Sequence, residues 1–135
     1  MATPSLWPTV GISPPRTMAE MLYDAAGDLA TVTGNRLDFY VDAIGVAPTH
    51  GPVTQIRYNC YIRVISKGYL HLFFQVTTPA GGPFPANLDT PEGDPYSPIH
   101  DEPELRNTIT AAMQRTQTTE VIEYLLRLAV PVTKP

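Results

Sequence analysis

The sequence predicts an α+β domain in which a three-stranded antiparallel meander follows one helix and precedes two more, in the order α-β-β-β-α-α. Three consecutive stretches alternate apolar and polar residues, which is the pattern of half-buried strands. The stretches before and after them carry apolar residues at helical spacing instead. With 135 residues, 43% hydrophobic and 16% charged, the chain is expected to form one domain around one core.

The first helix is predicted over residues 17–29. Its apolar stripe recurs every three or four residues, at Met18, Met21, Leu22, Ala25 and Leu29. Thr17 and Glu20 have the spacing of a capping box, which marks the start of the helix. Gly34-Asn35 is expected to end the helical region and turn the chain.

Three strands are predicted over residues 36–43, 54–65 and 69–77. The inner set, which faces the helices, comprises Leu37, Phe39, Val41, Ala43, Ile56, Tyr58, Cys60, Ile62, Val64, Leu70, Leu72, Phe74 and Val76. The outer set includes Asp38, Tyr40, Asp42, Arg57, Asn59, Tyr61, Arg63, Tyr69, His71, Phe73 and Gln75.

Loop lengths predict the register of the two hairpins. A three-residue loop ending in a left-handed Gly68 pairs Val64 with Leu70 and Ile62 with Leu72. The same register sets Tyr61 beside Phe73 and Arg63 beside His71 on the outer face. In the first hairpin, a loop over residues 47–52 pairs Val41 with Tyr58 and sets Asp42 opposite Arg57.

Two segments are rich in proline. Residues 1–15 contain four prolines and are expected to form an extended arm, which either packs on its own domain or inserts into a neighbouring molecule. Residues 79–103 contain seven prolines and no lysine or arginine, and they are expected to form a long acidic loop. Loops of this length are usually functional or disordered.

The C-terminal part is predicted to contain two helices. The first begins near Glu102, because Asp101 and Glu104 have capping-box spacing and a proline occupies the second helical position. A break is placed at residues 116–119, since the apolar stripe then changes side, and the second helix ends before Pro131. The stripe of this last helix is either a second packing surface or part of a dimer contact.

Charge and composition limit the possible partners. The net charge of −4 and the scattered basic residues disfavour nucleic acid and membrane surfaces. The order of helix, meander and helix is similar to that of double-stranded-RNA-binding domains, but those bind phosphate with a basic start to the final helix. Here that start is Asp101-Glu102-Pro103-Glu104.

The single cysteine, Cys60, and the absence of a secretory signal pattern predict a cytoplasmic protein.

Few residues suggest catalysis or metal binding. His100-Asp101-Glu102 could serve acid-base chemistry, but a helix cap explains the same residues. His50 and His71 lie on separate segments without zinc-ligand spacing. Cys60 points inward, where a thiol usually acts as a small hydrophobic group. No cofactor, no metal and, on balance, no enzymatic activity are expected.

The most informative pattern is the group of aromatic and basic residues on the outer face of the predicted sheet. This predicted interaction face comprises Tyr40, Arg57, Tyr61, Arg63, Tyr69, His71 and Phe73. Aromatic residues with arginine are typical of interface cores. The leading hypothesis is a non-enzymatic protein that self-associates or docks a protein partner through this face. The alternative is a small-molecule-binding domain or enzyme whose pocket lies between sheet and helices, with His71, Arg63 and Tyr61 as polar groups.

Overall fold

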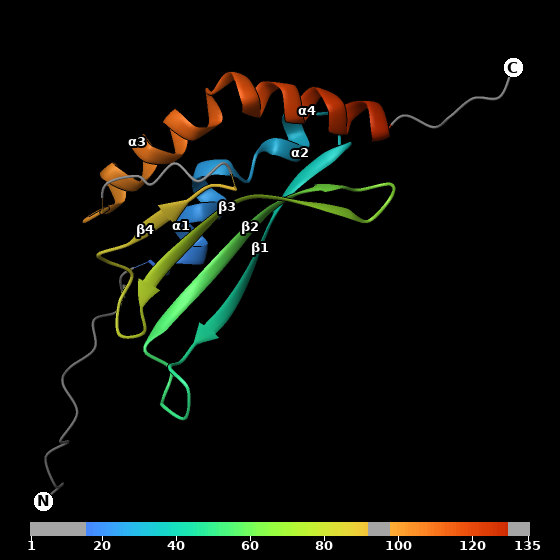
Figure 1. Ribbon diagram of the computed structural model, residues 1–135. Helices are drawn as coiled ribbons and strands as arrows, with labels where there is room; N and C mark the ends of the chain where they lie inside the picture. Colours follow the sequence, from blue (N-terminus) through green and yellow to red (C-terminus); the bar gives the residue numbers. More distant parts are fainter. Residues whose placement is uncertain (1–15, 92–97, 130–135) are drawn as a thin grey trace, which may run out of the picture.

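The computed structural model describes residues 16–91 and 98–129, which form a four-stranded antiparallel sheet with helices on one face (Figure 1). The predicted N-terminal arm lies outside the described residues. In chain order the elements are α1 (Met18–Ala26), α2 (Leu29–Val32), β1 (Leu37–Val46), β2 (Gln55–Val64), β3 (Tyr69–Pro79), β4 (Asn87–Asp89), α3 (Glu102–Met113) and α4 (Thr116–Ala129). The sheet order β1-β2-β3-β4 is that of a meander. The α+β class and an antiparallel sheet with helices before and after it are therefore confirmed, whereas the sheet has four strands instead of the predicted three.

The fourth strand lies inside the segment predicted to be one long loop. β4 pairs antiparallel with β3, and its central residue Leu88 is buried. Just before it, Ala86 and Ile99 exchange two backbone hydrogen bonds of 2.8 Å, and both side chains are buried. The described ends of residues 79–103 are thus part of the core, because three apolar side chains between the prolines reach it.

The caps of α1 and α3 match the predicted ones. The Thr17 hydroxyl accepts a hydrogen bond from the Glu20 N–H at 3.2 Å, and Asp101 accepts one from the Glu104 N–H at 2.9 Å. α1 is shorter than predicted and ends at Ala26, after which the separate helix α2 covers Leu29–Val32. Gly34 and Asn35, with φ of 61° and 62°, turn the chain into β1.

The register between β2 and β3 corrects the prediction near the turn. Val64 pairs with Tyr69 and Ile62 with His71, so the loop has four residues, 65–68. A β-bulge opposite Cys60 and Tyr61 then adds one residue to β3, after which Cys60 pairs with Phe74. The expected register therefore applies only beyond the bulge, because the inserted residue moves every earlier side chain to the other face.

The first hairpin also pairs differently from the prediction. Val41 lies opposite Cys60 instead of Tyr58, and Asp42 lies opposite Asn59 instead of Arg57. β1 is longer than expected, β2 is shorter, and the loop covers residues 47–54. This shift by two residues keeps the same side chains on each face, so the parity predicted for β1 and β2 is correct.

The core lies between the sheet and the helices in two adjoining clusters. The larger one contains side chains of α1, α3 and all four strands, including Leu22, Phe39, Phe74, Leu88 and Ile109. The smaller one joins α4 to the sheet through Leu37, Ile62, Val64 and Leu125. The apolar stripe of α4 is thus a packing surface for the chain's own sheet.

The break between α3 and α4 lies at residues 114–115, two residues before the predicted position. The hydroxyl of Thr118 donates a hydrogen bond to the Ala112 carbonyl at 2.6 Å, and Thr118 is buried. This bond satisfies a carbonyl at the end of α3. Thr118, which belongs to the predicted break, therefore lies in the first turn of α4 and connects it to α3.

Candidate functional site

The candidate site is the outer sheet face, which is the side of the sheet opposite the helices. Side chains of paired residues share a face, so the register defines its members. They are Asp38, Tyr40, Asp42 and Ile44 of β1, Arg57, Asn59, Tyr61 and Arg63 of β2, Leu70, Leu72, Gln75 and Thr77 of β3, and Asn87 and Asp89 of β4. No helix among the described residues covers this face (Figure 1).

The polar centre of the outer sheet face is an arginine held between an acid and a ring. Arg63 donates two hydrogen bonds to Asp38, one of them from Nε to Oδ1 at 2.9 Å. Its guanidinium lies 5.7 Å from the centroid of the Tyr40 ring, close enough for a cation–π contact. The hydrogen bond and the charge of Asp38 raise the pKa of Arg63, so this side chain remains cationic.

A ring pair and an amide pair complete the centre. The Tyr40 and Tyr61 rings lie 6.3 Å apart with an interplanar angle of 35°. On the same face, the Gln75 amide donates to the Asn59 side-chain oxygen at 2.7 Å. The apolar members Leu70 and Ile44 are 42% and 46% exposed. The outer sheet face therefore combines exposed apolar groups with two polar pairs, Arg63 with Asp38 and Gln75 with Asn59.

Three of the seven residues of the predicted interaction face lie on the other side of the sheet. Because of the bulge, Tyr69, His71 and Phe73 share the face of Val64 and Ile62, which the helices cover. Phe73 packs against both core clusters, and its ring centroid lies 4.9 Å from that of Phe74. Tyr69, near the turn, remains 50% exposed. Leu70 and Leu72 take their places on the outer sheet face.

The four other predicted residues, Tyr40, Arg57, Tyr61 and Arg63, do lie together on the outer sheet face. Sequence reasoning missed Ile44 and Leu70. Ile44 continues the parity of Tyr40 and Asp42 one step further along β1, a signal that was present in the sequence. Leu70 could not be found in this way, since its side depends on the bulge.

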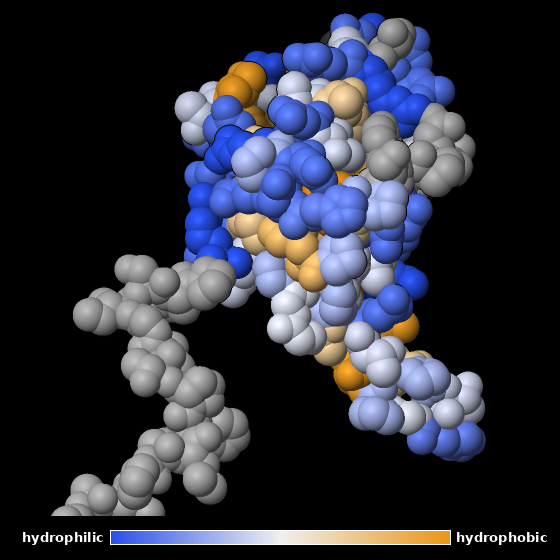
Figure 2. Space-filling model, turned by 90° about the vertical axis from the view of Figure 1, so that its left-hand side faces the viewer, coloured by the Kyte–Doolittle hydropathy of each residue, from blue (hydrophilic) through white to orange (hydrophobic). Residues whose placement is uncertain are grey.

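The far end of the β1–β2 hairpin projects beyond the helical layer (Figure 1). It carries exposed apolar side chains, among them Ile44 and Val53, which is 51% exposed. Figure 2 shows hydrophobic atoms on the narrow lobe below the body, at the end of the molecule where Figure 1 places this hairpin. Exposed apolar groups on a projecting element are typical of contact surfaces.

A second candidate is an apolar cavity of about 250 Å³ on the helical side of the sheet. Its floor is Phe39, Ile62 and Phe73, and α1, α2, α3 and α4 supply the walls. The polar residues of the alternative hypothesis do not line it. Tyr61 and Arg63 face the opposite side, and His71 lines a neighbouring cavity of about 20 Å³ beside Thr118.

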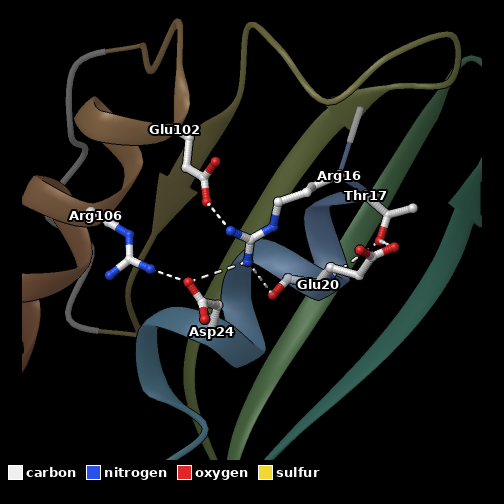
Figure 3. Close-up of polar contacts among 6 residues, drawn as sticks. All are labelled: Arg16, Thr17, Glu20, Asp24, Glu102 and Arg106. Atoms are coloured by element: carbon white, nitrogen blue, oxygen red, sulfur yellow. Dashed lines mark hydrogen bonds and ion pairs between the residues drawn. The ribbon is translucent and has the colours of Figure 1, made fainter. Parts of the chain in front are cut away.

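The densest group of charges joins α1 to α3 (Figure 3). Arg16 contacts Asp24 at 3.2 Å and Glu102 at 2.9 Å, and Arg106 also binds Asp24. Each charge faces an opposite one, so the group connects two helices and leaves no uncompensated charge for a ligand.

The acidic cluster at the start of α3 is likewise used by the fold. Asp101 caps the helix, Glu102 binds Arg16, and Glu104 accepts a hydrogen bond from the backbone N–H of His100 at 2.7 Å. The His100 ring lies 3.3 Å from the same carboxylate and is exposed. The arrangement explains these residues as a helix start.

Other chemical sites find little support in residues 16–91 and 98–129. There, no three His, Cys, Asp or Glu side chains come together where a metal ion could be held. Cys60 is fully buried, and this burial raises the pKa of its thiol. No helix within these residues has the length and apolar character needed to cross a membrane.

Comparison of the chain with protein-family models, with curated proteins and with solved structures gave no match. The outer sheet face and the apolar cavity are therefore the features of the chain that bear on its function.

Proposed function

We propose that this protein is a non-enzymatic assembly protein that docks through its outer sheet face, to a second copy of itself or to a partner protein. The observation that supports this proposal best is the state of the polar groups on the face. Arg63 is paired with Asp38 and Asn59 with Gln75. Removing water from such a face costs less than removing it from unpaired groups.

The apolar groups of the outer sheet face supply the favourable contribution to binding. Tyr40, Tyr61, Leu70 and Ile44 lie around the paired polar groups and are exposed or half-buried. Tyrosine and arginine at the centre of a patch are the residues that most often dominate binding energy. Arg57 and Asp42 carry opposite charges on the same face, so two copies in opposite orientation could complement each other.

The proposal predicts that Tyr61→Ser weakens association. Loss of the ring removes a central contact, and we expect the association constant to fall about tenfold, the effect typical of an interface anchor. The measurement is solution mass by light scattering over a range of protein concentrations. Tyr124→Ser is the matched control, because Tyr124 is a tyrosine of α4 that is 61% exposed away from the sheet.

Circular dichroism and a melting curve verify that both variants remain folded. Equal masses for wild type and Tyr61→Ser, with both proteins folded, would contradict a docking role for this face. So would an equal loss of association in Tyr124→Ser.

The apolar cavity supports a second candidate function, binding of a small apolar molecule. Its lining is almost entirely hydrocarbon, but at about 250 Å³ it is smaller than most drug-sized sites. The expected ligand is therefore compact, of the size of benzene or indole. A ligand of this kind should raise the melting temperature in proportion to its occupancy.

This candidate can be tested with indole and benzene as probes. Either one should shift the melting temperature of the wild type, and Ala26→Leu, which fills one wall of the cavity, should remove the shift. A shift that survives in Ala26→Leu, or no shift at saturating probe, would exclude the cavity as a binding site.

A further inference from the structure

We infer that the free edge of β1 pairs with β1 of a second copy of this chain, with Ile44 on the two-fold axis. The inference rests on the proposed assembly function and adds a partner and a register to it, but the contact is made by the backbone edge of β1 and not by the Arg63 and Tyr61 centre of the outer sheet face. It is carried by the hydrogen-bonding state of the backbone along β1.

Within residues 16–91 and 98–129, β1 pairs with β2 alone and is therefore an edge strand. The carbonyl groups of Arg36 and Val46 accept hydrogen bonds from Ile65 and Thr54, at the two ends of the ladder with β2. Even-numbered residues thus direct their backbone groups toward β2. The odd-numbered residues direct theirs to the free edge, because the direction alternates along an antiparallel strand.

In the first half of this edge, side chains of the chain itself bind the backbone of Leu37 and the N–H of Val41. The Leu37 N–H donates to the Thr33 hydroxyl at 3.1 Å, and that hydroxyl contacts the Leu37 carbonyl at 3.1 Å. The Val41 N–H donates to the Tyr23 hydroxyl at 2.9 Å. The ring of Tyr23 also lies edge-on to Phe39, at 5.8 Å, so α1 covers this stretch.

The second half of the edge is open. Ala43 and Gly45 are exposed, and within residues 16–91 and 98–129 nothing hydrogen-bonds their outward N–H and C=O groups. Unpaired groups of this kind on a formed strand are a template for another strand. The sequence around them, Val41 to Val46, is largely apolar and contains one charge, so the usual protection of an edge by lysine or proline is missing.

These constraints select one antiparallel register for two copies. If Ile44 faces Ile44 of the second copy, Ala43 pairs with the second copy's Gly45 and Gly45 with its Ala43, which forms four backbone hydrogen bonds. A register centred on Ala43 would instead require the Val41 N–H, which Tyr23 already holds. A register centred on Gly45 would require Ala47, which lies beyond the end of β1.

A second copy suits this edge better than an unrelated extended peptide. Its β1 is already formed, so pairing orders no new segment. The two-fold arrangement also closes both open edges at once. In this register the two Ile44 side chains lie directly opposite each other on the outer face, where each is now 46% exposed. The contact is small, and interfaces below about 1,000 Å² are usually weak, so we expect dimers at high protein concentration.

The symmetry gives a specific test with two charged variants. Ile44→Lys and Ile44→Glu should each dimerise about tenfold more weakly than wild type, because like charges then face each other on the axis. An equimolar mixture of the two variants should recover a dimer, since an ammonium group of one chain then faces a carboxylate of the other. The measurement is sedimentation velocity of each variant and of the mixture. A mixture that stays monomeric overturns the inference.

A cross-link tests the same register independently. Directly opposed residues of this type have Cα atoms about 4.5 Å apart, within the range that a disulfide can bridge. Ile44→Cys should form a covalent dimer under mild oxidation, while Leu70→Cys, of similar exposure on the outer face, should not. Cys60 is buried and does not interfere. Equal cross-linking of both variants would overturn the inference.

The variant Tyr61→Ser separates this inference from the proposed function. If the β1 edges pair and the outer sheet face binds nothing, Tyr61→Ser keeps the wild-type mass and Ile44→Cys still cross-links. If the edge is inert but the face docks, Tyr61→Ser loses mass and the mixture of charged variants behaves like its components.

Discussion

Truncating either Phe73 or Phe74 to alanine is expected to destabilise the domain strongly, although consecutive residues of a regular strand face opposite sides. Phe74 is fully buried, and its loss should lower the free energy of unfolding by about 3–5 kcal/mol. Phe73 is half-buried between the two core clusters, and its truncation should lower the free energy of unfolding by at least about 2 kcal/mol. The bulge at this point turns both rings toward the helices.

Leu72→Ala provides the control, because Leu72 precedes the bulge and faces the outer side opposite Tyr61. Leu72→Ala should lower the free energy of unfolding by about 1 kcal/mol or less. Urea unfolding followed by circular dichroism gives all three values. If Phe73→Ala left the stability nearly unchanged and Leu72→Ala lowered it strongly, β3 would alternate regularly and the bulge would be absent.

The bulge also explains why the site could be predicted only in part. Residues 69–74 are apolar or aromatic at nearly every position, so both parities bury a plausible set of side chains. Sequence alternation therefore assigned β1 and β2 correctly, where charged residues mark one face, and assigned the first half of β3 to the wrong face. Tyr40, Arg57, Tyr61 and Arg63 were found by alternation, whereas Tyr69, His71 and Phe73 were misplaced with the strand.

Other elements show the same distinction between local and tertiary causes. The helix starts at Thr17 and Asp101 depend on side chains within one turn, and both could be predicted. β4 has only three residues and no period to detect. It forms because Leu88 reaches a core built by distant segments. The open edge of β1 was also beyond prediction, since it depends on where Tyr23 and Thr33 place their hydroxyl groups.

The second large expected effect is a loss of stability in alkaline solution that depends on Cys60. Burial raises the pKa of this thiol in the folded protein above its ordinary value of 9.0. Above that pH the unfolded chain loses the thiol proton while the folded chain keeps it. The stabilising contribution is therefore complete below pH 9 and is lost as the pH rises, by up to about 1.4 kcal/mol per pH unit.

Tyrosine and lysine groups also titrate in this range, so the measurement compares wild type with Cys60→Ala. Between pH 9 and about 11 the wild type should lose stability relative to this variant, in urea unfolding at fixed ionic strength. Parallel curves for the two proteins would contradict the effect. In addition, the native thiol should resist alkylation at pH 8 and react once urea unfolds the chain.

The two edges of the sheet differ in length, and this limits how far chains could add to one another. β4, at the opposite edge from β1, has three residues, and the adjacent Ala86 is already bonded to Ile99. So short a strand provides too few backbone groups of its own to nucleate a further strand. Growth through β4 would thus stop after one step, so open-ended fibrils would have to use the part of β3 before Gln75, which β4 does not pair.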